Sequence, residues 1–250
     1  MFYTTKGLVL REAQYKDNDK ILSVLSQELG LISVKARGVK RKNSPLRGGC
    51  QLLTYSEFTL YERGGYYMVN EAEPLNLFSG LHQNIELLAL GSYFAQLLEM
   101  VATSEHSDQE LLALGLNSLY ALDVLKKPQD LVKAVFELRL MCLIGYAPML
   151  EGCGCCGAAQ AAHFILQGGT VLCDVCRKME PEGAEKILSP GVLSAMRHIS
   201  GCEKQRLFSF SLPPESMGLL GETTEAFLLT QLGQRVPALE FYKRLFTITI

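Results

Sequence analysis

Residues 20–38 read KILSVLSQELGLISVKARG, two runs rich in β-branched residues that are separated by a turn at Gly30. The second run alternates between apolar residues and polar or charged ones: Ile32, Val34 and Ala36 against Ser33, Lys35 and Arg37. Because successive side chains of a strand point to opposite faces, this run predicts a strand with an apolar inner face and a cationic outer face.

Similar short runs recur through the first 75 residues and predict a small β-barrel. The expected strands span about residues 3–12, 21–26, 31–38, 52–61 and 66–72, with turn residues between them. Because strand edges must be paired or covered, five short strands in so short a stretch favour a closed or partly closed barrel.

After residue 74 the hydrophobic spacing becomes helical. Helices are expected over about residues 84–102, 111–125, 131–146, 191–200, 216–232 and 239–246. The third of these is apolar on most sides, which is typical of a helix at the centre of a bundle. We therefore expect an α+β multi-domain fold, with a barrel over residues 1–78 and a helical domain over 79–250 that contains a cysteine-rich segment at 150–180.

The composition is that of an ordinary globular protein. Of the 250 residues, 48% are hydrophobic and 20% are charged, which excludes wholesale disorder. The longest mainly apolar run, residues 141–150, is too short to span a membrane. The first residues lack the basic and long apolar segments of a signal peptide, so we expect a cytoplasmic protein without a membrane role.

Charge is unevenly divided along the chain. The net charge is −2, but residues 1–50 carry +6 and the remaining residues carry −8. A basic N-terminal part joined to an acidic remainder predicts that the N-terminal part binds an anion. The basic strand also leads into a glycine-bounded loop with further cations, which suits DNA phosphates because each contact releases condensed counterions. The alternative is a solvated surface loop.

The expected barrel favours nucleic acid over that alternative, since small barrels of this class bind oligonucleotides on the face of strands 2 and 3. The candidate DNA-binding cations are Lys6, Arg11, Lys35, Arg37, Lys40, Arg41, Lys42 and Arg47. The aromatic residues of the same domain that could stack on bases are Phe2, Tyr3, Tyr15, Tyr66 and Tyr67, of which at least half should simply be core.

Five cysteines fall within 24 residues, and four of them form two C-x-x-C pairs separated by sixteen residues. The pairs are Cys153 with Cys156 and Cys173 with Cys176. This spacing is typical of zinc sites, in which two thiolates from each pair complete a tetrahedron with Zn–S distances of about 2.3 Å. Four thiolates leave no position for water, which favours one structural zinc ion over a catalytic one.

Other interpretations of this segment stay open. Cys155 could replace Cys156 as a ligand, although a one-residue gap between ligands is less common. His163 is the nearby imidazole, and we interpret it as a loop residue rather than a ligand. The cysteines could also be unrelated buried thiols, or one pair could be redox-active, but the α/β context of a redox pair is missing.

Motifs of several enzyme classes are absent from the sequence. It contains no GxxxxGK[ST], no HExxH and no G-x-S-x-G, so nothing in it argues for an enzyme. Two other functions compete with DNA binding: a zinc-stabilised protein–protein adaptor that does not bind DNA directly, and a zinc hydrolase. Coordination by four thiolates argues against the hydrolase.

Three stretches resemble the RecO family of bacterial recombination mediators. They are KGLVLRE…KARGVKRKNS in residues 6–44, FELRLMCLIGYAPMLEGCGCCG…GGTVLCDVC in 136–176, and FLLTQLGQRVPALEFYKRL in 227–245. The resemblance implies an N-terminal OB-fold, a helical C-terminal domain and an inserted zinc-ribbon-like segment. It matches Cys153, Cys156, Cys173 and Cys176 to the family's zinc ligands, and Lys35, Arg37, Lys40, Arg41 and Lys42 to its basic stretch. The additional Cys155 departs from the family pattern.

The resemblance further implies a function in DNA repair and recombination. Members of this family bind single- and double-stranded DNA, anneal complementary strands and, with RecR, help RecA replace single-strand-binding protein (SSB). They act in the bacterial cytoplasm, on the nucleoid, and they also hold the acidic C-terminal tail of SSB. Candidate residues for that tail, near the central helix, are Lys126, Lys127, Lys133 and Arg139, each of which could equally be a surface charge.

Overall fold

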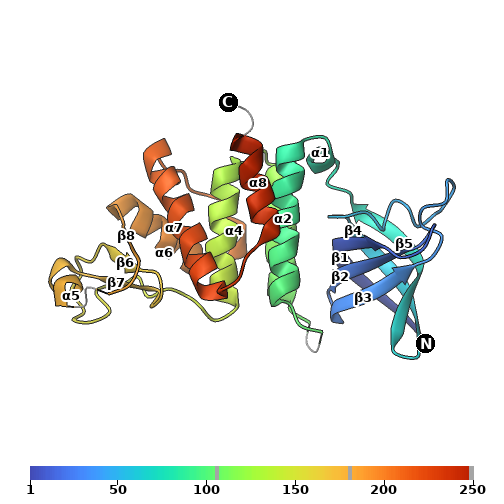
Figure 1. Ribbon diagram of the computed structural model, residues 1–250, viewed down its shortest axis with the longest axis horizontal. Helices are drawn as coiled ribbons and strands as arrows, with labels where there is room; N and C mark the ends of the chain where they lie inside the picture. Colours follow the sequence, from blue (N-terminus) through green and yellow to red (C-terminus); the bar gives the residue numbers. More distant parts are fainter. Residues whose placement is uncertain (105–106, 180–181, 248–250) are drawn as a thin grey trace. The chain divides into compact units, whose positions relative to one another are not determined.

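The computed structural model describes residues 1–104, 107–179 and 182–247 (Figure 1). Its contacts divide the chain into two compact units. The barrel unit comprises residues 1–126 and 236–250, and the helical unit comprises residues 127–235. The boundary predicted at residue 78 lies between the last strand of the barrel and the first helix, and it stays a prediction. The predicted segment 150–180 and the predicted domain 79–250 each end on a residue outside the described ranges.

Five strands form a closed barrel in the order β1-β2-β3-β5-β4. They are β1 (Phe2–Gln14), β2 (Lys20–Ser26), β3 (Gly30–Ala36), β4 (Tyr55–Arg63) and β5 (Tyr66–Asn76) (Figure 1). β3 pairs with β5 in parallel, and the other pairs are antiparallel. Buried apolar side chains from all five strands fill the interior. The predicted barrel is therefore confirmed, and it is OB-like.

The alternation predicted for β3 is confirmed. Its inner residues Ile32, Val34 and Ala36 are buried, whereas Lys35 is half-buried and Arg37 is exposed. The strand ends at Ala36, two residues earlier than expected. It ends there because Gly38 adopts a φ of 66° and turns the chain away from the sheet.

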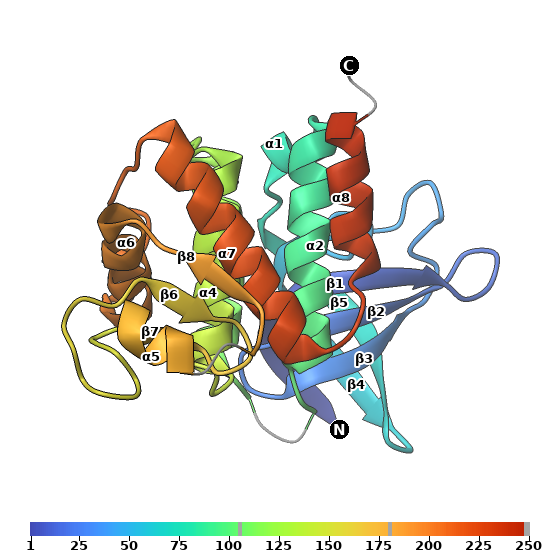
Figure 2. The same ribbon diagram turned by 60° about the vertical axis from the view of Figure 1, so that its left-hand side comes forward.

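The other elements of the barrel unit are α1 (Ser79–His82), α2 (Ile85–Val101), α3 (Gln109–Asp123) and α8 (Pro237–Thr247). Asn84 and Asp108 cap α2 and α3 by accepting hydrogen bonds from backbone N–H groups. α2 packs against β1 and, on another side, against α8 (Figure 2). Gly91 of α2 lies so close to Leu53 that a Cβ atom would collide with that side chain, which explains a glycine inside this helix.

The helical unit is built around α4 (Gln129–Leu143), which packs against α6 (Pro190–Gly201) and α7 (Pro214–Leu232) (Figure 2). α4 is buried on most sides, as its sequence predicts. A short 3₁₀ turn, η1 (Lys204–Arg206), follows α6. In the described ranges no helix is both long and apolar enough to cross a membrane.

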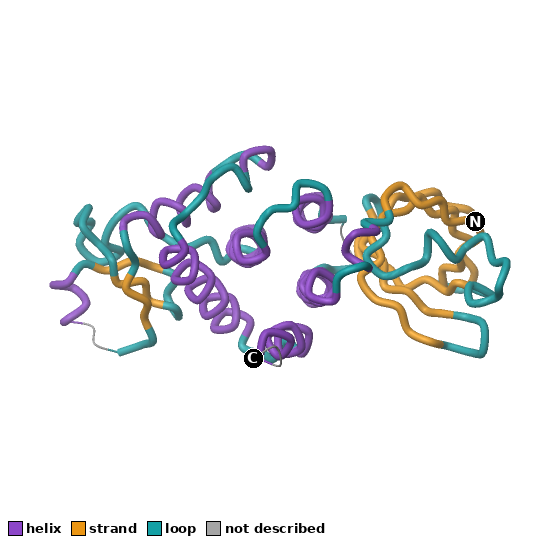
Figure 3. The backbone as a smooth tube through the Cα atoms, turned by 90° about the horizontal axis from the view of Figure 1, so that it is seen from above, coloured by secondary structure: helices purple, strands orange, loops and turns teal. Residues whose placement is uncertain are grey.

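The cysteine-rich segment forms a three-stranded sheet in the order β7-β6-β8 (Figure 3, left side, orange). Its elements are β6 (His163–Ile165), β7 (Thr170–Leu172), α5 (Asp174–Met179) and β8 (Glu185–Ile187). β6 and β7 pair antiparallel and form a hairpin between the two cysteine pairs. α5 and β8 were not predicted, because elements of three to six residues carry too little periodicity to be recognised.

Candidate nucleic-acid interface and metal centre

The outer wall of the barrel carries a groove of about 640 Å³, here called the wall groove. Its charged and aromatic lining residues are Tyr15, Lys35, Arg37, Arg63, Tyr66 and Tyr67. They come from the end of β1, from β3 and from the hairpin of β4 and β5. The groove therefore combines three cations with three aromatic rings, although these residues lie far apart in the sequence.

Strand pairing brings the members of the wall groove together. β3 runs parallel to β5, so that Lys35 pairs with Met68. Arg63 and Tyr66 face each other across a two-residue turn of glycines with φ values of 61° and 79°, as a tight hairpin turn requires. Sequence reasoning missed Arg63. The signal for it was available, since a Gly-Gly turn pairs the residues on its two sides.

One carboxylate lies beside the cations of the wall groove. The Lys35 ammonium is 3.7 Å from Oδ2 of Asp19, and the other carboxylate oxygen, Oδ1, accepts a hydrogen bond of 2.8 Å from the Gly38 N–H. This hydrogen bond, with Lys35 and Arg37, lowers the pKa of Asp19 below its ordinary value of 3.8. Arg37 and Arg63 are exposed and make no ion pair within the described residues. The cationic face is thus only partly neutralised.

The tyrosines of the wall groove are accessible to a ligand. Tyr66 is 78% exposed and can offer a ring face to a flat partner, whereas Tyr15 is 44% exposed and has the Lys35 ammonium 4.2 Å from its ring centre. Tyr67 is half-buried, and its ring packs edge-on against Tyr3 with the centroids 5.9 Å apart. Of the five predicted aromatic residues, three therefore line the groove. Phe2 instead packs against Tyr61 of β4, with the two rings tilted by 49°.

A second groove of about 540 Å³ contains Lys40 and Arg47 together with Lys20 and His82. It is called the end groove here, because it lies where β1, β2 and the loop after β3 meet α1 and α2. The two grooves share no lining residue. Four of the predicted DNA-binding cations thus divide between two grooves, with Lys35 and Arg37 in one and Lys40 and Arg47 in the other.

The remaining predicted DNA-binding cations lie outside both grooves. Arg41 and Lys42 are exposed in the loop after β3, and Lys6 is exposed on β1 opposite Glu57 of β4. Arg11 forms an ion pair of 2.8 Å with Glu99 of α2. This pair links α2 to the barrel, which gives Arg11 a structural role in addition to the predicted one.

Lys133, a candidate for the SSB tail, is buried in the helical unit. Its ammonium lies 2.7 Å from Glu137 and 2.8 Å from Glu225, and Glu137 has no exposed surface. Burial alone would lower the pKa of Lys133, but the two carboxylates outweigh it and raise the pKa. The side chain therefore joins α4 to α7 and is not available at the surface.

The other three candidates for the tail differ in their surroundings. Arg139 donates hydrogen bonds to two carbonyl oxygens at the end of α6. Lys126 is exposed and lies 3.7 Å from Asp123, and Lys127 is half-buried. Lys126 and Lys127 belong to different units. Tail binding stays a prediction for these residues.

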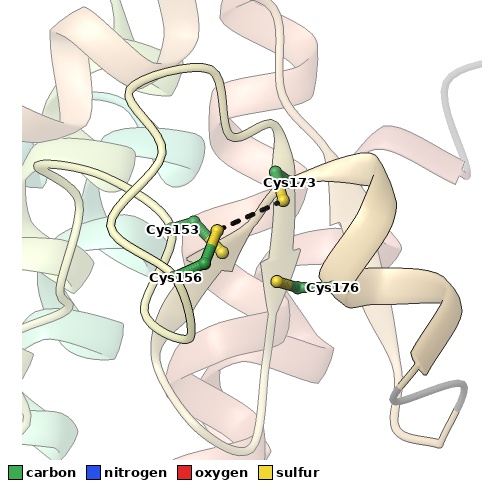
Figure 4. A group of neighbouring side chains, drawn as sticks. All are labelled: Cys153, Cys156, Cys173 and Cys176. Carbon is green, nitrogen blue, oxygen red and sulfur yellow. Dashed lines mark hydrogen bonds between the residues drawn. The ribbon is translucent and has the colours of Figure 1, made fainter.

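The four cysteines of the two predicted pairs converge on one point (Figure 4). Their sulfur atoms all lie within 4.8 Å of one another, and those of Cys156 and Cys173 are 3.7 Å apart. A tetrahedral zinc ion with Zn–S distances of about 2.3 Å places its sulfur ligands about 3.8 Å apart. The spacing of the sulfur atoms therefore fits this metal.

Backbone N–H groups prepare two of the thiols to act as ligands. The N–H of Cys156 lowers the pKa of Cys153 to about 6, and the N–H of Cys176 lowers the pKa of Cys173. A thiol binds zinc as the thiolate, so a lowered pKa favours the form that is needed. Cys155 is exposed and is not part of the cluster.

His163 does not point to the cysteine cluster. It begins β6, and its two ring nitrogens lie 3.0 Å from Glu185 and 2.8 Å from Asp174. Hydrogen bonding to Asp174, together with Glu185, raises the pKa of His163. Both nitrogens are thus engaged by carboxylates, which agrees with the interpretation that His163 is not a ligand.

Comparison with known proteins gives matches over most of the chain. The family model described as Recombination protein O N terminal matches residues 1–78, and Recombination protein O C terminal matches residues 82–240. A DNA repair protein RecO from Acetivibrio thermocellus is 30% identical over 98% of this chain and 97% of its own length. Its counterpart from Heliobacterium modesticaldum is 31% identical over 85% of this chain and 79% of its own. The DNA repair protein RecO of Caldicellulosiruptor saccharolyticus is 25% identical over 97% of this chain and 98% of its own length.

Proposed function

This chain belongs to the RecO family of DNA repair proteins, and from that premise we propose that it binds DNA through its barrel as a recombination mediator. In this proposal it anneals complementary strands and, with RecR, helps RecA to load on SSB-coated DNA. The observation that carries the proposal is the wall groove, in which exposed tyrosines lie beside arginines that have no ion-pair partner among the described residues.

The chemistry of the wall groove fits a single strand. Unpaired bases stack on aromatic rings, whereas the bases of a duplex are covered by their neighbours, so the exposed Tyr66 favours single-stranded DNA. Arg37 and Arg63 can meet phosphates on either side of a stacked base. Such contacts position the strand without reading its sequence, as a protein that must act on any sequence requires.

Annealing in this scheme needs no chemical step by the protein. Two complementary strands repel each other through their phosphates, and cations that neutralise those phosphates lower the barrier to pairing. The protein would supply charge and position, while base pairing supplies the driving force. We therefore propose a mediator rather than an enzyme, which acts where its DNA lies, in the bacterial cytoplasm.

We propose one structural zinc ion in each chain, held by Cys153, Cys156, Cys173 and Cys176. The ion would tie the turn before β6 to the start of α5 and so stabilise a sheet whose strands have only three residues each. Four thiolates leave no position for a substrate, so the ion would contribute to folding and not to catalysis.

A strand-annealing assay tests this function directly. The rate at which complementary oligonucleotides pair is measured on bare DNA and on DNA coated with SSB, with and without the protein. We expect acceleration in both cases, and no acceleration by the double variant Lys35→Glu, Arg37→Glu. If the protein accelerates pairing neither on bare DNA nor on SSB-coated DNA, the proposal is overturned, and the adaptor that does not bind DNA becomes the better explanation.

The proposed partners follow from the family and need their own test. RecR and the acidic tail of SSB are the partners in question. A pull-down with each purified partner, repeated with Lys126→Glu and Lys127→Glu, would show whether these two candidates for the tail take part. Unchanged capture of SSB by both variants would remove these two lysines from the proposed site.

A further inference from the structure

The basic residues after β3 serve two different sites on the barrel. Arg37 lines the wall groove, and only three residues later Lys40 lines the end groove. We infer that the end groove is a second DNA site, which binds the phosphodiester backbone of a duplex without contacting its bases. This inference rests on the proposed function and assigns a separate place on the barrel to double-stranded DNA.

The direction of the β2 side chains separates the two grooves. Ile21 lines the wall groove and its neighbour Lys20 lines the end groove. Successive residues of a strand point to opposite faces of the sheet. Ile21 pairs with Lys35, whose side chain belongs to the outer face, whereas Lys20 pairs with the buried Ala36. The wall groove thus lies outside the sheet, and the end groove opens at the end of the barrel.

The lining of the end groove suits phosphates and not bases. Lys20, Lys40 and Arg47 bring three positive charges, and His82 adds a further group that can donate a hydrogen bond. The one acidic residue in the lining, Glu12, pairs with Lys20 at 2.6 Å, which leaves Lys40 and Arg47 in excess. No tyrosine or phenylalanine lines this groove within the described residues, so it offers no ring for an unpaired base.

Lys40 and Arg47 lie on a loop whose backbone is held in place by hydrogen bonds and by a buried side chain. The N–H of Lys40 donates to the carbonyl of Asn18 at 3.1 Å, and Arg47 lies next to Leu46, whose side chain is buried in the barrel core. Further along, the N–H of Cys50 donates to the carbonyl of Leu46 at 3.1 Å. The loop is therefore held by its backbone, and less entropy is lost when its side chains meet a phosphate chain.

Metal and redox chemistry do not explain the end groove. Its thiol, Cys50, is 1% exposed, and burial raises its pKa to about 12. At neutral pH this thiol is protonated, and a protonated, buried thiol is neither a metal ligand nor a nucleophile. The cations that line the end groove are therefore its functional groups, and the partner that they fit is a polyanion.

Two separate sites give the barrel a way to hold two forms of DNA together. A single strand in the wall groove would stack its bases on Tyr66, while a duplex in the end groove would present only its backbone to Lys40 and Arg47. Arg41 and Lys42, which lie between Lys40 and Arg47 in the sequence, are exposed and add positive charge to the loop that carries the end-groove cations. A DNA molecule in which a single strand continues into a duplex fits this arrangement of the two grooves.

Two double variants separate the sites. Lys40→Glu with Arg47→Glu alters the end groove, and Arg37→Glu with Tyr66→Ala alters the wall groove. Lys204→Glu with Arg206→Glu, two exposed cations of η1 in the helical unit, is the control that matches the first variant in charge. Affinities for a blunt duplex and for a single strand of equal length are measured by fluorescence anisotropy at several salt concentrations. Melting temperatures of all variants establish that they are folded.

The end-groove variant is expected to lose affinity for the duplex at least several-fold more than affinity for the single strand. For the duplex, the slope of log affinity against log salt concentration should become shallower by about 0.9 for each phosphate that the variant no longer neutralises. The wall-groove variant should show the opposite preference, and the control should resemble the parent. Equal duplex binding by the folded end-groove variant and the parent would overturn the inference while leaving the proposed function intact. No DNA binding by the parent would overturn the proposed function itself.

Discussion

The ammonium group of Lys35 lies 4.2 Å from the centre of the Tyr15 ring. This arrangement is a cation–π contact, and it holds a positive charge beside an aromatic face in the wall groove. The carboxylate of Asp19 lies 3.7 Å from the same ammonium group, and it also accepts a hydrogen bond from the N–H of Gly38 in the turn after β3. A phosphate that enters the groove must compete with this carboxylate for Lys35.

The competition predicts that Asp19→Asn tightens the binding of single-stranded DNA. Asparagine keeps the oxygen that accepts the hydrogen bond from Gly38, but it removes the negative charge beside Lys35 and Arg37. Titration of a labelled oligonucleotide with parent and variant measures the effect. The exposed neighbour Asp17→Asn is the control for net charge, and weaker binding by Asp19→Asn than by this control would contradict the proposed competition.

The same substitution changes the dependence of stability on pH. Because the folded state lowers the pKa of Asp19, its carboxylate stabilises the protein above the ordinary pKa of 3.8. That stabilisation is lost as the pH falls through the lower, folded-state pKa. Urea unfolding between pH 6 and about pH 3 should therefore show the parent losing its advantage over Asp19→Asn at the acidic end. A difference that is independent of pH would exclude this role.

Tyr66→Ala is expected to weaken binding of single strands by about 1–3 kcal/mol, the contribution of one base stacked on an aromatic side chain. Because Tyr66 is 78% exposed, the melting temperature should not change. Tyr66→Phe keeps the ring and should bind as the parent does. Equal weakening in the alanine and phenylalanine variants would point to the hydroxyl group instead of stacking.

Cys153→Ser and Cys173→Ser are each expected to lose about one zinc ion per chain and to destabilise the helical unit. Cys155→Ser should keep its zinc, because Cys155 lies outside the cluster. Metal analysis after dialysis, combined with thermal unfolding, measures both effects. Full zinc content in both cluster variants would refute the proposed set of ligands.

Lys133→Met should lower the free energy of unfolding by about 3–5 kcal/mol, since it leaves one buried and one partly buried carboxylate without their cation. The carboxylates concerned are Glu137 on the same helix and Glu225 on α7. Lys204→Met, at an exposed lysine, is the matched control and should change stability little. A decrease of less than about 1 kcal/mol in Lys133→Met would show that the pairs contribute little to the fold.

Local patterns in the sequence are sufficient to predict most of the fold. The alternation in β3 identifies its inner and outer faces, and Asp108 is recognisable as a cap of α3. The cysteine spacing identifies the four members of the cluster, because a C-x-x-C pair brings two sulfur atoms to one side over a short distance. In each case the information lies within a few neighbouring residues.

The arrangement of the sites depends on contacts between distant residues, and the sequence pattern does not contain them. Lys133 resembles a surface cation until α7 brings Glu225, 92 residues away, against it. Lys35 and Lys40 look like one basic run, but the turn at Gly38 sends them to different grooves. Arg63 joins the wall groove only because β5 pairs with both β3 and β4.

The role of the wall groove in DNA binding is tested most directly by the salt dependence of single-strand binding in the double variant Lys35→Glu, Arg37→Glu. Affinities for oligonucleotides of several unrelated sequences are measured at a series of salt concentrations, with Lys204→Glu, Arg206→Glu as the control. We predict weaker binding of every sequence and a salt slope reduced by about 0.9 for each phosphate that is no longer neutralised. Affinities and slopes equal to those of the parent would contradict this role.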